Sequence, residues 1–202
     1  MPRPARYAKG LAKREEILTT ALEVIARTGY RGTSVKELAN AVGLSQAGLL
    51  HYFASKEELF AEILAKRDAV NEEAFGERGE SPVDGLVSTA RHNATVPGLV
   101  QLYAQFSIEA SGPGHPSHDV FVERYARVRE LITADIDARQ AAGTLPPGVD
   151  PATAASLLVA AADGLQIQWL LDPEVDMAAH LSTLLSLLGS APGPAAGSGP
   201  AR

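Results

Sequence analysis

Residues 115–123 hold the one group of side chains in this sequence with the character of metal ligands: His115, His118, Asp119 and Glu123. His118 and Asp119 could meet Glu123 across one helical turn, and imidazole and carboxylate groups both bind divalent metals. Both histidines, however, lie in a loop rich in proline and glycine, and the paired histidines of a zinc hydrolase helix are absent. We therefore expect no metal site and no cofactor.

Other catalytic arrangements are missing as well. The chain has no cysteine, which excludes a disulfide framework, a cysteine nucleophile and cysteine-ligated zinc. It contains no Gly-x-Ser-x-Gly turn, no phosphate-binding glycine-rich loop and no Gly-x-Gly-x-x-Gly. The longest apolar run, Leu157 to Ala162, ends at Asp163 and is far shorter than the about 18 residues of a membrane span. We expect a cytoplasmic protein that is not an enzyme.

Charge is distributed unevenly along the 202 residues. The net charge is −6, but residues 1–70 carry net +3 and residues 71–202 carry net −9. A basic N-terminal third can approach a polyanion that the acidic remainder repels. This asymmetry favours a nucleic-acid-binding head on a body with another task.

The head contains two short predicted helices, 35–42 and 46–52, joined by Gly43-Leu44. Apolar residues of the first can pack against Leu44 and Leu49, which is typical of a helix-turn-helix. The free face of the second would then present Gln46, Ala47, Gly48, His51 and Tyr52. In a major groove, Gln can pair with adenine and Ala can touch a thymine methyl group. By spacing alone, a purely structural helical hairpin fits equally well.

The stretch from Leu11 to Asn71, and above all Gly29 to Leu59, resembles the DNA-binding domain of the TetR (tetracycline repressor) family. The resemblance places the helix-turn-helix at residues 33–52 and implies that Phe53 anchors the recognition helix in the core. Leu50 stands where the family most often has Tyr, so His51 or Tyr52 would have to supply that backbone contact. The DNA-contacting residues it implies are Thr33, Ser45, Gln46, Ala47, Gly48, His51, Tyr52 and Lys56, with Thr33, Tyr52 and Lys56 on phosphates.

An all-α fold must position these residues, because apolar residues recur at helical spacing and no alternating strand pattern occurs. Capping patterns at Ser34, Ser55, Asp150 and Asp172 mark helix starts. Nine helices are predicted, near 11–28, 35–42, 46–52, 56–75, 82–93, 97–110, 117–141, 151–171 and 173–189. We expect a basic flexible arm (1–10), a DNA-binding domain (11–71), a ligand-binding and dimerisation domain (72–189) and a disordered tail (190–202).

The predicted body holds aromatic residues on three helices, interrupted by polar ones. TetR-like proteins hold small effectors in this helical body, so the resemblance implies a ligand. The candidate effector residues are His92, Tyr103, Phe106, Glu109, Phe121, Tyr125, Gln166 and Trp169; ordinary core packing is the alternative for each aromatic. Aromatic faces attract cations and the acidic body repels anions, so we expect an apolar or cationic effector.

The last two predicted helices show more apolar surface than one body can cover. In the family the corresponding pair joins its symmetry mate, which implies a homodimer that reads a palindromic operator in double-stranded DNA. The candidate interface residues are Ala161, Leu165, Leu181, Leu184, Leu185 and Leu188. We therefore expect a transcriptional repressor that leaves its operator when an effector binds. An effector-blind dimeric DNA-binding module and a metal-dependent enzyme with a vestigial head are the alternatives.

Overall fold

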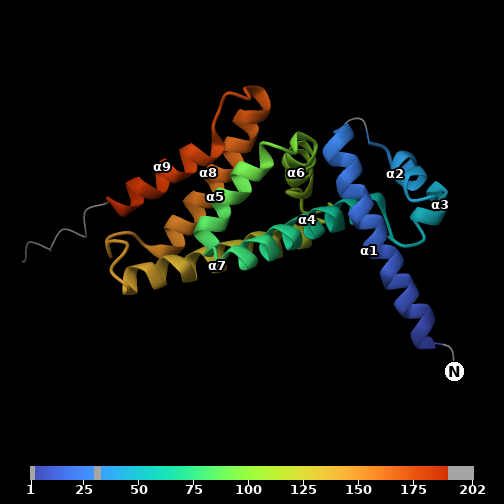
Figure 1. Cartoon of the computed structure of the whole chain (residues 1–202), viewed down its shortest axis with the longest axis horizontal. Helices are drawn as coiled ribbons and strands as arrows, with labels where there is room; N and C mark the ends of the chain where they lie inside the picture. Colours follow the sequence, from blue (N-terminus) through green and yellow to red (C-terminus); the bar gives the residue numbers. More distant parts are fainter. Residues whose placement is uncertain (1–2, 30–32, 191–202) are drawn as a thin grey trace, which may run out of the picture. The chain divides into compact units, whose positions relative to one another are not determined.

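The computed structural model describes residues 3–29 and 33–190, so most of the predicted disordered tail lies outside the described residues. Within these ranges the chain forms nine helices and no strand, which confirms the all-α prediction (Figure 1). They are α1 (Arg3–Thr28), α2 (Val35–Ala41), α3 (Gln46–Leu49), α4 (Lys56–Arg78), α5 (Pro82–Asn93), α6 (Pro97–Ala110), α7 (His118–Ala141), α8 (Pro151–Leu171) and α9 (Met177–Gly189).

Several helix boundaries differ from the sequence prediction, among them those of α1, α3 and α9. Helix α1 begins at Arg3 rather than at Leu11, so the segment expected to be a flexible arm is helical over its described part. Helix α3 is a single turn that ends at Leu49, and residues 50–55 form turns and bends. Helix α9 begins at Met177, because the Asp172 side chain accepts the N–H of Glu174 in a turn while Asp176 caps the helix by accepting the N–H of Ala179.

The helices form two compact units. Unit 1 comprises residues 1–78 and 92–123, and unit 2 comprises residues 79–91 and 124–202. Helix α6 therefore groups with the predicted DNA-binding head.

In unit 1, α1 packs against α2, α4 and α6. Ile17 and Ile25 of α1 are fully buried, as are Leu59 and Ile63 of α4. The contact with α6 is very close at Gly98, where a Cβ atom would lie 2.0 Å from the carbonyl oxygen of Ile25 and 2.8 Å from the Cα of Gly29. Only glycine fits there without displacing the α1 backbone.

A single side chain of α1 ties the turn after α3 to α4. The guanidinium of Arg14 donates to the carbonyl oxygen of Tyr52, to Glu58 (2.8 Å) and to Glu62 (Nε to Oε2, 2.9 Å). It also lies 4.5 Å from the centre of the Phe53 ring. The hydrogen bond to Glu62, and then that to Glu58, raises the pKa of Arg14, although burial opposes the shift. The charge of Arg14 is thus used inside the unit, in contacts with the turn after α3 and with α4.

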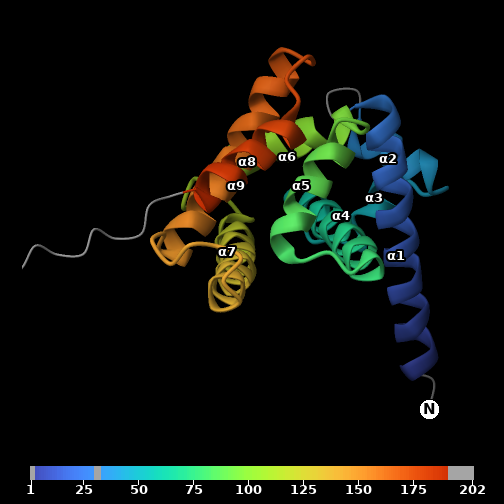
Figure 2. The same ribbon diagram turned by 60° about the vertical axis from the view of Figure 1, so that its left-hand side comes forward.

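In unit 2, α8 lies alongside α9 (Figure 2) and supplies much of the core. Ala154, Ala155 and Leu158 are almost completely buried with Ile132 and Ile136 of α7. Among the described helices, α8 is the one long and apolar enough to cross a membrane by length and composition. Its buried alanines and leucine pack against other helices of its own unit.

We expect Gly98→Ala to destabilise the protein by about 1–3 kcal/mol, because the added methyl group meets backbone atoms that cannot rotate away. Gly76→Ala in α4 is the matched control. A Cβ at Gly76 meets nothing within 4 Å, and alanine is the better helix former by up to about 1 kcal/mol. Urea unfolding of both variants checks this, and equal effects would contradict the close contact.

We expect Arg14→Met to lower the free energy of unfolding at neutral pH by about 1.5–3 kcal/mol, the usual range for a hydrogen bond to a charged group. Hydrogen bonding from Arg14, assisted by the N–H of Ala54, holds the pKa of Glu58 below its ordinary value. The stabilisation is therefore present above about pH 4.3 and is lost as the pH falls through the lowered pKa.

The difference between wild type and Arg14→Met should thus shrink in acid, as measured by urea unfolding across pH. Lys66→Met is the control, since Lys66 pairs only with the exposed Glu15 and such a pair contributes about 1 kcal/mol at most. A pH-independent difference would show that the carboxylates are not responsible.

Candidate functional site

Local hydrogen bonds define the start of α2 and the turn after it. The Ser34 hydroxyl accepts the N–H of Glu37 (3.2 Å), and the Glu37 carboxylate accepts the N–H of Ser34 (2.6 Å), which confirms the predicted capping box. The hydrogen bond from the Ser34 backbone lowers the pKa of the Glu37 carboxyl group. Gly43 then has a φ of 69°, a left-handed conformation that glycine adopts readily, and reverses the chain.

Helix α3 exposes the residues predicted to read base edges. Ser45 caps it by accepting the N–H of Gly48 (3.0 Å), and Leu49 is fully buried beneath it. Gln46, Ala47 and His51 are exposed and Gly48 is half-buried. The structure thus brings the predicted base-reading residues together on one short helix and its following turn.

The residues predicted to contact phosphates lie in three different settings. Thr33 is buried, and its hydroxyl donates to the carbonyl oxygen of Gly29 (2.6 Å), so its side chain serves the link between α1 and α2. Tyr52 is half-buried, with its ring edge-on to that of His51. Lys56 is exposed on the first turn of α4, where helix N–H groups also favour an anion. Of the three, the Lys56 ammonium is the group most available to a phosphate.

Helix α4 starts differently from the predicted capping box. Ser55 accepts the N–H of Glu58 (3.0 Å), but the Glu58 carboxylate reaches the N–H of Ala54 instead of that of Ser55. Glu58 also pairs with Arg14, so this helix start is linked to α1.

The eight predicted effector residues do not form one group within either unit. In unit 1, Tyr103 and Phe106 each contact Phe121, with ring centres 6.4 and 5.7 Å apart. His92 and Glu109 are exposed, and Glu109 accepts a hydrogen bond from Gln105. The other three predicted residues lie in unit 2: Tyr125, whose hydroxyl donates to Asp163 (2.6 Å), and the buried Gln166 and Trp169.

Arg67 is a buried residue of α4 that lies against Tyr103, one of the aromatic residues of unit 1. Its guanidinium is 4.9 Å from the centre of the Tyr103 ring and pairs with Asp68 at 2.9 Å. Ring contact and ion pair stabilise this charge at a core position, although Nη1 of the guanidinium is buried without a hydrogen-bond partner among the described residues.

The histidines of the loop before α7 make local hydrogen bonds. His115 Nδ1 accepts the N–H of Ser117 (3.2 Å), and His118 Nδ1 lies 2.9 Å from the carbonyl oxygen of Ala110, to which it donates. Over residues 3–29 and 33–190, no three His, Asp or Glu side chains are grouped so that they could hold a metal ion.

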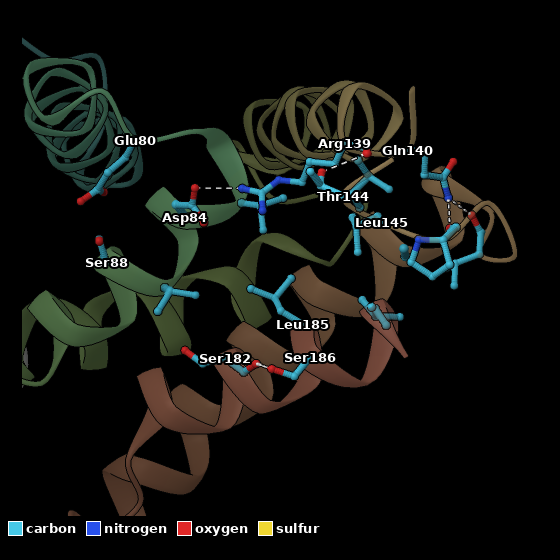
Figure 3. A pocket seen from close by; sticks show the side chains of 18 of the residues that line it. Glu80, Asp84, Ser88, Arg139, Gln140, Thr144, Leu145, Ser182, Leu185 and Ser186 are labelled. Atoms are coloured by element: carbon cyan, nitrogen blue, oxygen red, sulfur yellow. Dashed lines mark hydrogen bonds and ion pairs between the residues drawn. The ribbon is translucent and has the colours of Figure 1, made fainter. Parts of the chain in front are cut away.

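Unit 2 contains a cavity of about 640 Å³ that sequence reasoning missed (Figure 3). Asp84 of α5 and Arg139 of α7 lie on one side of it, and Ser182, Leu185 and Ser186 of α9 lie on the opposite side. None of the predicted effector residues lines it. No motif marks it, because its walls come from helices and a loop that are far apart in the sequence.

The polar wall of the cavity contains a charge network that is nearly buried at Asp135 and exposed at Asp84. Arg139 donates to Asp135 (3.2 Å), Asp84 (2.8 Å) and Ser81 (2.7 Å), and Asp135 also accepts the N–H of Val83 (3.0 Å). Burial alone would raise the pKa of Asp135, but hydrogen bonds from Ser81, Val83 and Arg139 outweigh it and lower the pKa. The pKa of Arg139 is raised despite burial, because both carboxylates hydrogen-bond to it. Asp135 and Arg139 therefore stay ionised at neutral pH.

The predicted dimer residues of α9 mostly face their own unit. Leu181 is fully buried in its own unit, so it does not face a second copy. Leu184, Leu185 and Leu188 are half-buried and pack in part against the core of unit 2, and their place in a dimer interface stays a prediction. On α8, Leu165 is buried and Ala161 half-buried. The exposed large apolar side chains of this helix pair are Leu157, Ile167, Leu171 and Leu187.

Comparison with known proteins identifies both parts of the chain. Residues 17–63 match the model of the bacterial regulatory proteins of the tetR family, and residues 116–189 match that of the BetI-type transcriptional repressor, C-terminal. The chain is 33% identical to the transcriptional repressor KstR2 of Rhodococcus jostii over 134 residues, which cover 65% of this chain and 64% of KstR2.

Solved structures agree. A transcriptional regulator from Saccharomonospora viridis in complex with choline is 26% identical, with a TM-score of 0.66, covering 86% of this chain and 95% of that one. FadR from Bacillus subtilis in complex with stearoyl-CoA is 20% identical, with a TM-score of 0.64, covering 87% and 97%, and shows the same fold. With the helix-turn-helix of α2 and α3 in place, these matches show that the chain belongs to the TetR family, whose members are transcriptional regulators and not enzymes.

Proposed function

We propose that this protein is a ligand-responsive, DNA-binding transcriptional repressor of the cytoplasm. The observation that carries the proposal is the exposed surface of α3. Gln46, Ala47 and His51 are exposed there, while Leu49 is buried and the Ser45 cap holds the helix start. Small and polar groups on a rigid, capped helix suit base-edge readout in a major groove.

Base reading alone would bind DNA weakly, because phosphate contacts provide most of the affinity. Lys56 is an exposed cation at the start of α4, which follows α3 after the turns and bends of residues 50–55. Leu50 is half-buried and carries no hydroxyl, so a contact in this turn falls to His51 or Tyr52. Thr33 can contribute its backbone N–H, since its hydroxyl is already bonded to Gly29.

We propose that the protein acts as a homodimer on a palindromic operator. One turn of α3 reads too few bases to select a site, whereas two copies one helical turn of DNA apart read twice as many. The exposed apolar side chains of α8 and α9, Leu157, Ile167, Leu171 and Leu187, provide the surface for a second copy. Burying them between two chains would remove them from water.

Effector response is the second part of the proposal. Related structures contain choline or stearoyl-CoA, which supports a small-molecule site in a fold of this kind. An effector that prefers a conformation with separated heads would weaken DNA binding. Bound DNA would weaken the binding of the effector by the same free energy. The sequence alone predicts an apolar or cationic effector; the lining of the unit 2 cavity, described below, favours a different class. An effector-blind dimeric module is the alternative.

Two variants separate base reading from phosphate binding. We expect Gln46→Ala to weaken operator binding by about 1–3 kcal/mol and to change binding to random duplexes little, because it removes a base-edge contact. Lys56→Ala should weaken binding to all duplexes alike and reduce the slope of log affinity against log salt by about one unit. Fluorescence anisotropy across salt concentrations measures both.

Lys36→Ala is the control, since Lys36 is an exposed cation of α2, outside the predicted contacts. Equal losses on operator and random DNA for Gln46→Ala would make Gln46 a backbone contact. An unchanged salt slope for Lys56→Ala would remove Lys56 from the interface.

Charged substitutions test the dimer. Ile167→Asp combined with Leu187→Asp would bury two carboxylates at an apolar contact, a penalty of several kcal/mol, so sedimentation should show monomers that bind half-sites weakly. Leu131→Asp on α7 is the control, because Leu131 is similarly exposed but lies outside α8 and α9. A dimer that survives the double substitution would place the interface elsewhere.

A further inference from the structure

The cavity of unit 2 has the size of a small-molecule site. Its volume of about 640 Å³ lies within the range of about 300–1,000 Å³ that is typical of ligand pockets. All of its lining residues belong to unit 2. Their chemistry therefore indicates which class of molecule it can hold.

Most polar groups around the cavity are already bonded to other protein groups. Arg139 donates to two carboxylates and a hydroxyl, and the Gln140 amide donates to the carbonyl oxygens of Pro146 and Val149. The hydroxyls of Ser182 and Ser186 donate to carbonyl oxygens one turn earlier in α9. These groups shape the wall but offer few free donors to a ligand.

Two donors on α5 are left for a ligand. Ser88 and Arg91 both line the cavity. Their side chains make no hydrogen bond or ion pair within the described part of the chain. They are three residues apart in one helix, so they lie on the same face. A hydroxyl and a guanidinium side by side suit a carboxylate, which accepts charge-assisted hydrogen bonds.

Apart from these groups, Glu80 and Thr144, the lining is mostly aliphatic. Val83, Val87, Ile136, Leu145, Leu185 and Leu188 contribute to it, and no aromatic ring does. Without an aromatic face, the cavity lacks the cation–π contact on which the expectation of a cationic effector depends. Aliphatic walls suit an alkyl chain.

We propose that this cavity binds an amphipathic organic anion, an aliphatic chain that ends in a carboxylate. The carboxylate pairs with Arg91 and Ser88, and the chain lies against the aliphatic wall that includes Val83, Ile136 and Leu185. The acidic net charge of the chain does not prevent this, because solvent-exposed charges farther away than about 8 Å are largely screened, whereas Arg91 is adjacent. This anion would be the effector of the proposed repressor. Its effect on DNA binding rests on that proposed function, whereas its binding in the cavity does not.

Three probes of equal chain length test the head group: decanoate, 1-decanol and decyltrimethylammonium, each below its micelle-forming concentration. Isothermal titration of the full-length protein without DNA should rank decanoate first and decyltrimethylammonium last. Arg91→Gln should weaken decanoate binding about tenfold, the effect of losing a hydrogen bond between charged groups, and leave 1-decanol binding unchanged.

Two further variants complete the design. Arg129→Gln removes the same charge from an exposed position of α7 that does not line the cavity, so decanoate binding should not change. Ser88→Phe extends a ring into the cavity and should weaken decanoate and 1-decanol alike. Circular dichroism confirms that each variant is folded.

Several results would overturn the proposal: no decanoate binding to wild type, tighter binding of the cationic probe, or decanoate binding that neither Arg91→Gln nor Ser88→Phe weakens. Operator release is measured separately by anisotropy. Decanoate that binds in the cavity but leaves operator affinity unchanged would refute the effector role while confirming the site.

Discussion

The recognition surface of α3 depends on the contacts that the guanidinium of Arg14 makes. From α1 it reaches the carbonyl of Tyr52, the ring of Phe53 and the carboxylates of Glu58 and Glu62. The turn after α3 contains no helix, and a helix of one turn is not stable alone. Because Arg14 joins the middle of that turn to the first two turns of α4, it restrains the segment that follows α3. The exposure of Gln46 and Ala47 is therefore a property of unit 1 as a whole.

Close backbone packing extends this support to α6. Gly98 allows α6 to touch the carbonyl of Ile25 at the end of α1. In the same unit, Arg67 of α4 lies against the ring of Tyr103 of α6. The helices of the head are thus joined to α6 by rigid backbone contact and by a buried charge. The predicted DNA-binding domain of residues 11–71 does not include α6, although these contacts place α6 in the same compact unit.

Unit 2 uses its charges differently. Arg139 pairs with both Asp135 and Asp84 in the wall of the cavity, so the donors of its guanidinium are used inside the protein and the polar side of the cavity offers few free groups. Local pairing, and not the net charge of the chain, then determines what the cavity can bind. Ser88 and Arg91 are the exceptions, and their chemistry favours an acceptor group on the ligand.

By itself, the sequence determined the helices and the helix-turn-helix, because these depend on neighbours within about four residues. The Ser34 and Glu37 capping box, the reversal at Gly43 and the cap at Ser45 are all of this kind. Tertiary structure decided what each helix face meets. Leu181 and Leu185 share a periodic stripe that suits a dimer interface and a core equally, and Arg14 has the same local signature as a solvated cation. Only the packing of distant segments placed the leucines inward, joined Arg14 to α4 and formed the cavity between α5, α7 and α9.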